Sequence, residues 1–496
     1  MKRHARPVQG KNDFDADLNH KYLFFRRTKI IATIGPASSS PKIIREMILN
    51  GLNVARINFS HGSARDHLRT IQSIRSISEK LGRPVAIMGD LCGPKIRVGK
   101  FAGDAAFLKE KSTVFITVEP VLGNETVIPC QYKKLVSEVS VNTQILLDDG
   151  NIELKVTKKG RDGVQARVVR GGILKNDKGM NLISTPMNIP SLTAKDRKDL
   201  SYCIEGQVDY IALSFVRTHK DVVELKNILR RRKADIAVIA KIEKPEALQN
   251  IHAILHIADG IMIARGDLGV ELPAKKVPFI QNKLIEACIQ NGKPVIVATQ
   301  MLESMIDNTR PTRAEVTDVS AACLSSADAV MLSAETASGR YPVQALQMMD
   351  SILRQTEAYQ FFTHGGMFRD VSFRNGDTSQ NAVSAAIAQL SRDLRVRCII
   401  VPTRSGSAAY MVSSDRPSSP VIALTSSEKV LKRLLLIWGV HPYYTDSKYD
   451  IRESLAYAEA FMKRLKLAGR GDYLLIVTKT RIKKTDNRSI TVHKIA

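Results

Sequence analysis

Short apolar runs recur along the first two thirds of the chain, and helical patterns separate them. Eight such runs cover 28–35, 53–60, 84–91, 209–216, 236–243, 259–267, 294–300 and 329–336. Nearly continuous apolar strands that alternate with helices are typical of a parallel sheet covered on both faces. Eight units of this kind predict an α/β fold, a (β/α)8 TIM barrel, in which functional side chains gather at the C-terminal ends of the strands.

Polar side chains stand at the end of nearly every run, where a barrel would bring them to one rim. They are Arg56, Asn58, Ser60, Asp90, Ser214, Lys241, Glu243, Asp267, Thr299, Ser333 and Glu335. Residues two apart in a strand share a face, so Lys241 and Glu243 point the same way. That pair alone also fits an internal salt bridge at a strand end. The convergence of so many polar ends favours a binding site instead.

Two stretches differ from the barrel units in their pattern of strands, turns and helices, and they predict further domains. From Arg97 to about Pro190 the chain alternates short strands and turns, which indicates a small β-barrel inserted in one barrel loop, where it could act as a lid. After a helix around 341–359, strands and helices alternate again, which indicates a C-terminal α/β domain. We therefore expect an N-terminal extension (1–21), a barrel (22–92 and 191–359), a lid (93–190) and a C-terminal α/β domain (360–496).

The composition is that of an ordinary globular protein, with 44% hydrophobic and 25% charged residues. The six cysteines are scattered, without a CxxC pair. This argues against a zinc site or a disulfide framework and predicts a cytoplasmic protein. No apolar stretch is long enough to span a bilayer, and no secretory signal is evident, so we expect no membrane partner.

The formal net charge of +25 is unusual and raises the question of nucleic-acid binding. The basic residues are dispersed, however, and 5% aromatic residues leave few platforms on which bases could stack. These features argue against a nucleic-acid partner. A basic surface can instead attract phosphorylated anions, or it can simply be solvated.

Three features of the rim are chemically specific. Glu243 and Asp267 offer carboxylate oxygens from neighbouring strand ends, which suit Mg²⁺ with positions left open for substrate oxygens. Lys241 beside them offers a cation to a developing anion. Arg56 and Arg97 suit phosphate recognition, although rim salt bridges are an alternative for both. The sequence has neither a Walker A motif nor a GxGxxG fingerprint, so a nucleotide would be held in another way.

Several motifs occur in order and together resemble the pyruvate kinase family. They include TKIIATIGPAS, NVARINFSHG, DLCGPKIR, GIMIARGDLGVELP, GKPVIVATQMLESM and ADAVMLSAETASGRYP. The resemblance implies phosphoryl transfer from phosphoenolpyruvate to ADP, giving pyruvate and ATP, in a three-domain chain that assembles as a homotetramer. An alternative is a metal-dependent lyase or aldolase acting on pyruvate enolates. Such an enzyme would share the Lys, Glu and Asp rim but would need neither lid, arginine set nor C-terminal domain.

The resemblance also implies roles for individual residues. Glu243 and Asp267 hold Mg²⁺, with Mn²⁺ as an alternative, and Lys241 stabilises the transferring phosphoryl group and the enolate. The remaining roles are phosphate binding by Arg56, carboxylate binding by Ala264, Arg265, Gly266, Asp267 and Thr299, nucleotide binding by Asn58, His61, Arg97 and Lys178, and support of a proton-donating water by Thr299 and Ser333.

The sequence departs from the family where many members bind K⁺. Asn58, Ser60 and Asp90 match that site, but Leu91 stands where the family has Thr, and Lys95 where it has Glu. Leu91 removes a hydroxyl ligand, and the Lys95 ammonium can supply the positive charge that the ion otherwise brings. We therefore expect an enzyme that does not require K⁺. The alternative is that Lys95 points to solvent and the ion site survives.

The stretch 399–414 suggests regulation, because a strand, a Gly/Ser loop and a helix start favour anion binding. The family's phosphosugar effectors bind at the corresponding place, which makes Thr403, Arg404, Ser405, Gly406 and Ser407 candidates. A plain strand–helix turn is the alternative. The end of the chain lacks the Gly-rich stretch common in the family. A sugar monophosphate, a nucleoside monophosphate and no effector all stay open.

Overall fold

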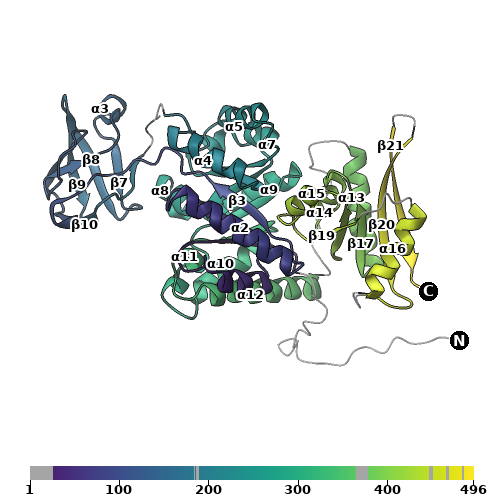
Figure 1. Ribbon diagram of the computed structural model, residues 1–496. Coiled ribbons are helices and arrows are strands. Elements are labelled where there is room, and N and C mark those ends of the chain that lie inside the picture. Colours follow the sequence, from purple (N-terminus) through teal and green to yellow (C-terminus); the bar gives the residue numbers. More distant parts are fainter. Residues whose placement is uncertain are drawn as a thin grey trace.

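The structure, a computed structural model, has three parts: a central barrel, an inserted sheet on one side of it and a C-terminal α/β unit on the opposite side (Figure 1). It describes residues 26–183, 185, 189–364, 378–445, 451–464, 468–482 and 485–496. The expected N-terminal extension, 1–21, lies outside the described residues. The domain boundaries drawn from the sequence stay predictions.

Eight parallel strands close the central barrel in the order β1-β16-β15-β14-β13-β12-β3-β2. Their bounds are β1 Lys29–Thr33, β2 Val54–Asn58, β3 Ala86–Asp90, β12 Tyr210–Leu213, β13 Ala237–Ile242, β14 Gly260–Ala264, β15 Val295–Ala298 and β16 Ala329–Leu332. Each of the eight apolar runs contains one of these strands, which confirms the predicted barrel. The apolar runs are nearly continuous because barrel side chains pack both on the interior and on the surrounding helices.

Helices surround the barrel and bury one face each against its strands (Figure 1). Their bounds are α1 Pro41–Leu49, α2 Ala64–Lys80, α4 Ala194–Glu205, α5 His219–Arg231, α6 Pro245–Gln249, α7 Ile251–Ile257, α8 Arg265–Glu271, α9 Val277–Gln290, α10 Arg313–Leu324, α11 Ala334–Ala337 and α12 Pro342–His364. Ser40, Ser63, Thr193 and Thr312 cap α1, α2, α4 and α10 by accepting a hydrogen bond from a first-turn N–H group. The caps fix where each helix begins and therefore how long each rim loop is.

The inserted part is an open, curled sheet with its own apolar core. Six strands pair in the order β11-β7-β8-β9-β5-β6, and β10 pairs separately with β4. The bounds are β4 Ala105–Leu108, β5 Thr113–Thr117, β6 Val127–Pro129, α3 Leu135–Glu138, β7 Gln144–Leu147, β8 Ile152–Lys159, β9 Gly163–Arg170, β10 Gly172–Lys175 and β11 Met180–Leu182. The fold class is confirmed, with the difference that the lid strands curl without closing into the small barrel expected from the sequence.

The C-terminal unit is a five-stranded sheet in the order β19-β18-β17-β20-β21, flanked by helices. Its bounds are α13 Thr378–Asp393, β17 Cys398–Pro402, α14 Ser407–Ser414, β18 Val421–Thr425, α15 Glu428–Leu434, β19 Val440–Tyr444, α16 Ile451–Arg464, β20 Tyr473–Ile482 and β21 Thr485–Lys494. It docks on the N-terminal ends of the barrel strands: Lys29 Nζ donates to the Val440 carbonyl at 2.7 Å, and Arg416 pairs with Asp328 at 3.0 Å. The C-terminal ends of the barrel strands therefore lie on the side of the inserted sheet (Figure 1).

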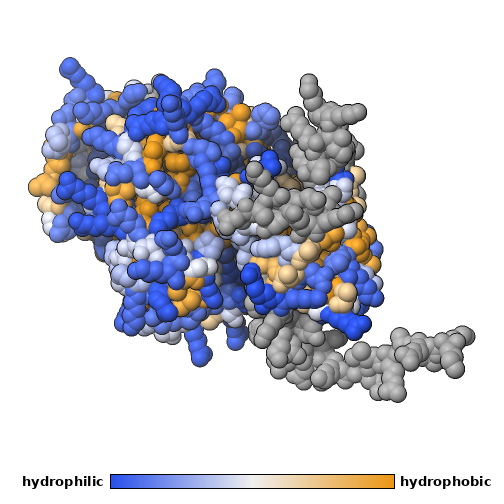
Figure 2. All heavy atoms as spheres, turned by 45° about the vertical axis from the view of Figure 1, so that its right-hand side comes forward, coloured by the Kyte–Doolittle hydropathy of each residue, from blue (hydrophilic) through white to orange (hydrophobic). Residues whose placement is uncertain are grey.

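The face shown in Figure 2 is mostly hydrophilic, with apolar side chains in separate patches. Among the helices that the structure describes, none combines the length and the apolar character needed to cross a bilayer.

Candidate active site

A buried cluster of two cations and two carboxylates occupies the rim at the ends of β2, β3 and β13. Lys241 Nζ lies 2.9 Å from Glu243 Oε1 and 3.3 Å from Asp90 Oδ1, and it donates to the Ser214 hydroxyl at 2.7 Å. The second oxygen of Asp90 accepts a hydrogen bond from Arg56 Nε at 2.7 Å. The structure therefore brings together three predicted residues, Arg56, Lys241 and Glu243, and adds Asp90 between the two cations.

The register of the strands explains this meeting. Asn58 of β2 pairs with Asp90 of β3, and Arg56 lies two residues earlier on the same face as Asn58. The next strand, β12, ends just before Ser214, whose hydroxyl donates to the Leu91 carbonyl at 2.7 Å. Ser214 thus holds the end of β3 with its proton and accepts from Lys241 with its oxygen.

Burial and charge oppose each other at Lys241 and Asp90. Burial alone would lower the pKa of Lys241, but the charges of Asp90 and Glu243 outweigh it and raise that pKa. Burial would likewise raise the pKa of Asp90, yet Lys241 and Arg56 hold it below its ordinary value. Lys241 is therefore a fixed ammonium and Asp90 a fixed carboxylate throughout the neutral range.

Glu243 differs from Asp90, because its pKa is raised above the ordinary value. Burial raises this pKa most, the charge of Lys241 lowers it, and repulsion from Asp267 raises it again. A bound cation between Glu243 and Asp267 would remove this cost. In the described part of the chain no cluster of three or more His, Cys, Asp or Glu side chains could hold a metal. Two carboxylates nevertheless fit Mg²⁺, because it keeps waters and substrate oxygens among its ligands.

The loops after β14 and β15 form a second wall of the rim. The Gly266 N–H donates to the Thr299 hydroxyl at 2.8 Å, which joins two predicted substrate-binding residues. Thr299 and Gln300 have φ values of 67° and 53°. The buried Arg265 guanidinium donates to both carbonyls, at 2.7 and 3.1 Å, and pairs with Asp318 at 2.7 Å. The Arg265 side chain thus holds the loop, while Ala264 ends β14 beneath it.

Ser333 follows β16, and its position depends on a buried acid, Glu335, that belongs to the polar strand ends but has no role in the predicted chemistry. The Glu335 carboxylate accepts from the Ser333 N–H at 2.7 Å and from the Leu302 N–H at 3.2 Å. Burial raises the pKa of Glu335. No hydrogen bond joins Ser333 and Thr299 in the described structure. Glu335 and Ser214 were both visible among the polar strand ends, which is the signal by which they could have been found.

The predicted nucleotide group is divided between the rim and the lid. His61 follows β2, and its pKa is lowered by partial burial and then by the charges of Arg97, Lys95 and Arg56. In the lid, Lys178 Nζ pairs with Asp148 at 2.7 Å. Lys178 is thus paired within the lid.

Within the lid, Arg97 donates to the Asp177 carbonyl at 2.8 Å. Other contacts tie the lid to the barrel. Asn181 Nδ2 of β11 donates to Glu271 of α8 at 3.0 Å, and Glu271 also pairs with Lys244 at 2.5 Å. The lid is therefore anchored beside α8, the helix that carries Asp267.

The residues of the expected K⁺ site have other partners here. Asn58 Oδ1 accepts from the Ser60 N–H at 3.1 Å, and the buried Leu91 offers its carbonyl to Ser214. Lys95 Nζ lies 4.0 Å from Asp267 Oδ1, with 32% of its side chain exposed, and its Cε lies beside Gly179 of the lid. Lys95 is therefore directed toward Asp267, between barrel and lid.

The loop after β17 is shaped by Gly406, which has a φ of 85° at the start of α14. Its N–H donates to the Thr403 hydroxyl at 2.9 Å, and the hydroxyls of Ser405 and Ser407 lie 3.0 Å apart. Arg404 is exposed. The five residues predicted for an effector thus form one loop on the C-terminal unit, on the side that faces the barrel.

Comparison with known proteins agrees with this architecture. Residues 25–346 match the model for the pyruvate kinase barrel domain, and residues 381–492 match the model for the pyruvate kinase alpha/beta domain. The chain therefore belongs to the pyruvate kinase family, and the expectation of a phosphotransferase of this family is confirmed. The alternative of a metal-dependent lyase or aldolase is not favoured.

Individual relatives are similar along nearly the whole chain. A pyruvate kinase of Geobacillus stearothermophilus is 42% identical over 481 residues, which are 95% of this chain and 81% of that protein. One of Thermococcus litoralis is 42% identical over 461 residues, covering 92% and 96%. A crystal structure of a pyruvate kinase from Cryptosporidium parvum superposes with a TM-score of 0.86 at 34% identity, covering 96% and 97%. All three parts of the fold therefore have counterparts in relatives.

Proposed function

We propose that the chain transfers the phosphoryl group of phosphoenolpyruvate to ADP, with Lys241 facing the group in transfer. The observation that carries the proposal is the buried ammonium of Lys241, held by Asp90 and Glu243 beside Arg56. Phosphoryl transfer needs positioning and charge neutralisation more than covalent chemistry. A fixed cation in a water-poor rim supplies both without reorganising during the reaction.

In the proposed reaction, the bond between phosphorus and the enol oxygen of phosphoenolpyruvate breaks, and a bond to a terminal β-phosphate oxygen of ADP forms. Arg56 binds the phosphoryl oxygens, and Lys241 neutralises charge on the phosphoryl group and on the enolate that it leaves. The loop of Gly266 and Thr299 binds the substrate carboxylate. A water supported by Thr299 and Ser333 donates a proton to the methylene carbon, which completes pyruvate.

Enzymes of the pyruvate kinase family use a divalent metal, and we assign its binding to Glu243 and Asp267, with Mg²⁺ as the ion and Mn²⁺ as a substitute. When bound, the metal neutralises substrate oxygens as a Lewis acid. The raised pKa of Glu243 supports the assignment, because a buried carboxyl of this kind gains from a cation. On the rim, Asn58, His61 and Arg97 would meet the ADP phosphates, and Lys178 would reach them when the lid moves.

We further propose that K⁺ is not required. The ammonium of Lys95, 4.0 Å from Asp267, supplies a fixed positive charge between barrel and lid. The charge therefore stands at the metal side of the rim and acts over several ångströms in a low-dielectric site. The remaining proposals come from the family: a homotetramer, a cytoplasmic location and a phosphorylated effector at the loop 403–407. Size-exclusion chromatography with light scattering tests the tetramer.

The deciding experiment measures pyruvate formed from phosphoenolpyruvate with ADP and Mg²⁺, coupled to lactate dehydrogenase and NADH. Pyruvate should form only when ADP and the metal are both present, and ATP should appear in equal amount. Pyruvate release without ADP, or from a carbon-chain adduct of pyruvate, would point to a lyase or aldolase instead. For the effector, Ser405→Glu should abolish the response to sugar phosphates, and an unchanged response would show that the loop is not the site.

A further inference from the structure

A buried ion pair joins the two segments that carry the assigned metal ligands. Lys244 directly follows Glu243, just after β13. Glu271 ends α8, four residues or about one helical turn after Asp267. Lys244 Nζ lies 2.5 Å from Glu271 Oε1, and only 7% and 3% of the two side chains are exposed. The pair therefore links the end of β13 to α8, the two segments that would hold the metal between them.

Both members of the pair have a further partner. The same Glu271 oxygen accepts a hydrogen bond from Asn181 Nδ2 of the lid strand β11 at 3.0 Å. The Lys244 ammonium lies 5.8 Å from the centre of the Phe215 ring. The Phe215 N–H in turn donates to Glu243 Oε2 at 2.9 Å. Glu243 is thus connected to the pair twice, through its neighbour in the chain and through Phe215.

The assigned metal ligands need such a link, because two carboxylates that face one cation repel each other when the cation is absent. The charge of Asp267 acts against that of Glu243. This repulsion pushes α8 away from the end of β13, whereas the attraction between Lys244 and Glu271 holds them together. Separating a buried ion pair leaves two uncompensated charges, so the pair resists movement of the two segments.

We propose that the Lys244–Glu271 pair positions the metal site, by holding α8 and the end of β13 at the separation that a divalent cation needs. Neither side chain is a ligand in this proposal; both are positioning residues that act through their neighbours in the chain. The proposal rests on the assignment of the metal to Glu243 and Asp267 in the proposed function, and it adds what keeps these two carboxylates in place. Partners of this outer kind typically contribute about 10- to 100-fold to metal affinity.

The sign of one effect separates positioning from simple electrostatics. Lys244→Met removes a positive charge close to a site that binds a cation, so the change of charge alone would tighten metal binding. If the pair positions the ligands, the same substitution weakens metal binding, because α8 is released from the end of β13. The two explanations therefore predict opposite changes for one variant.

The test measures the dissociation constant of Mn²⁺ by electron paramagnetic resonance of the free ion, on the full chain without phosphoenolpyruvate or ADP. Lys244→Met should weaken Mn²⁺ binding by about tenfold or more. Lys244→Met/Glu271→Gln leaves no buried charge unpaired and keeps the net charge, so it should fold even where the single variant does not. This double variant should weaken binding by a similar factor, because the two residues act as a unit. Thermal transitions show whether each variant is folded.

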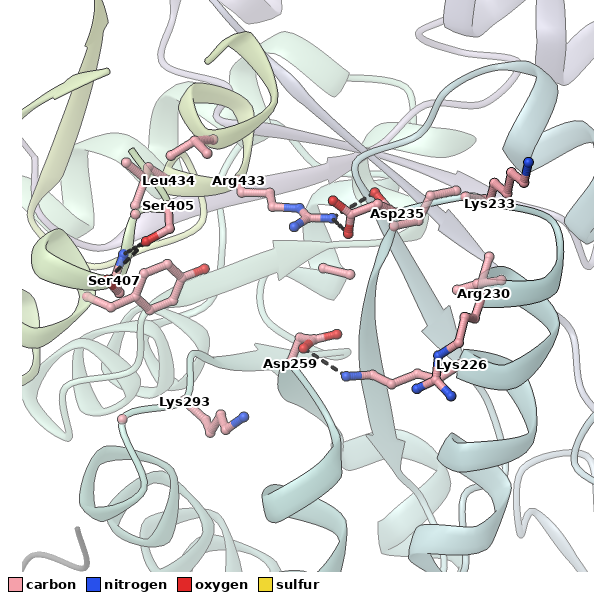
Figure 3. Close-up of a pocket in the computed structure, with 18 residues that line it drawn as sticks. Lys226, Arg230, Lys233, Asp235, Asp259, Lys293, Ser405, Ser407, Arg433 and Leu434 are labelled. Atoms are coloured by element: carbon pink, nitrogen blue, oxygen red, sulfur yellow. Dashed lines mark hydrogen bonds and ion pairs between the residues drawn. The ribbon is translucent and has the colours of Figure 1, made fainter. Parts of the chain in front are cut away.

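Lys226→Met/Asp259→Asn is the matched control, because it removes another barrel ion pair, with a distance of 2.9 Å, at the start of β14. Figure 3 shows this pair beside the cavity between α5 and the C-terminal unit, far along the barrel from the rim. The control should bind Mn²⁺ as the unmodified chain does. Asn181→Ala removes only the lid's contact with Glu271 and should weaken Mn²⁺ binding by no more than about threefold, the share of one hydrogen bond.

Unchanged or tighter Mn²⁺ binding in folded Lys244→Met, or in the double variant, would overturn the proposal. An equal loss in the control pair would do the same, and so would a loss in Asn181→Ala as large as that in Lys244→Met. Glu243→Gln separates the proposal from the metal assignment. If Glu243→Gln weakens Mn²⁺ binding and Lys244→Met does not, the assignment stands and positioning by the pair is wrong. If Glu243→Gln binds Mn²⁺ as the unmodified chain does, both are wrong.

Discussion

Two lysines are buried at opposite ends of the barrel, and their surroundings have opposite effects on their pKa. At the rim, Asp90 and Glu243 raise the pKa of Lys241 despite its burial. At the N-terminal end, Lys29 donates to the Val440 carbonyl. Burial and the nearby charge of Arg26 lower its pKa to about 7. Burial alone therefore does not produce a permanent ammonium; the carboxylates that accompany the lysine do.

The difference separates a catalytic use from a structural use of a buried lysine. Lys241 keeps its charge at every physiological pH because two carboxylates balance it, so it can stabilise a moving anion. Lys29 joins two domains through a neutral carbonyl, and at or below neutral pH the cost of burying its charge opposes folding. Removing or altering one charge at a time at these two ends separates the two uses.

The largest effect is expected for Lys241→Met. Removing the ammonium should lower kcat by about 10³-fold or more, since a single preorganised electrostatic contact contributes about 10²–10³ and this one is a full charge. Phosphoenolpyruvate binding, measured by calorimetry, should change only a few-fold, because Arg56 and the Thr299 loop remain.

Lys241→Met also leaves Asp90 and Glu243 without their shared cation, so the thermal transition of the variant must be compared with that of the unmodified chain. Lys275→Met, which removes an exposed lysine of the barrel, is the matched control and should keep full activity. Turnover near the original value in a folded Lys241→Met enzyme would exclude the proposed role of Lys241.

The second prediction concerns Glu243→Gln. Loss of one of two carboxylates should weaken Mn²⁺ binding by about 10- to 100-fold, a typical cost of losing a metal-site contact, measured by electron paramagnetic resonance of free Mn²⁺. Metal affinity of the original chain should also fall as the pH drops, because the raised pKa of Glu243 favours its protonated form. Glu286→Gln, on the exposed face of α9, should bind Mn²⁺ normally. Equal affinities in both variants would place the metal elsewhere.

The third prediction concerns K⁺. Activity of the original chain in K⁺-free buffer with a tetramethylammonium salt should lie within about twofold of the activity with K⁺, because Lys95 supplies a fixed charge. Lys95→Glu should lose about tenfold in K⁺-free buffer and recover much of this loss when K⁺ is added. Lys95→Gln separates loss of charge from reversal of charge. A many-fold stimulation of the original chain by K⁺ would contradict the proposal.

The barrel could be predicted from the sequence because each strand is an apolar run whose pattern is local. Its eight strands and the polar ends of their rim followed from periodicity alone. The partners of the rim charges could not be predicted from periodicity, because they depend on how the barrel closes. Asp90 was grouped with Asn58 and Ser60, yet it pairs with Arg56 and Lys241. The contact of Lys95 with Asp267 likewise depends on where the lid is anchored.

The pairing of Lys244 with Glu271 could not be predicted either. Each residue follows a strand that the sequence predicts, but the two side chains meet only because β13 and β14 are neighbours in the closed barrel. The open lid sheet has the same origin. Whether a curled sheet closes depends on strand pairings between distant segments, and alternation of polar and apolar residues is similar in both cases.

The smallest expected effect is the pH dependence of the contact made by Lys29. In the folded chain its pKa is about 7, against an ordinary value of 10.5. Below about pH 7 the lysine is charged in both states, and burial of that charge destabilises the folded chain by its full amount. Between about pH 7 and 10.5 only the unfolded chain binds the proton, so stability rises with pH until the penalty is gone.

Lys29→Met removes this titration, and the comparison of its melting temperature with that of the original chain isolates it. The variant should be relatively most stable at pH 6 to 7, and its advantage should shrink by a few degrees as the pH rises toward 10. Lys275→Met provides the baseline, since an exposed lysine should give a difference that does not vary with pH. The neighbouring charged groups Arg26, Asp328, Glu357 and His441 remain in both chains, so their titration cancels to first order. An advantage that grows with pH would mean that Lys29 is a permanent ammonium like Lys241, and the contrast between the two ends of the barrel would not hold.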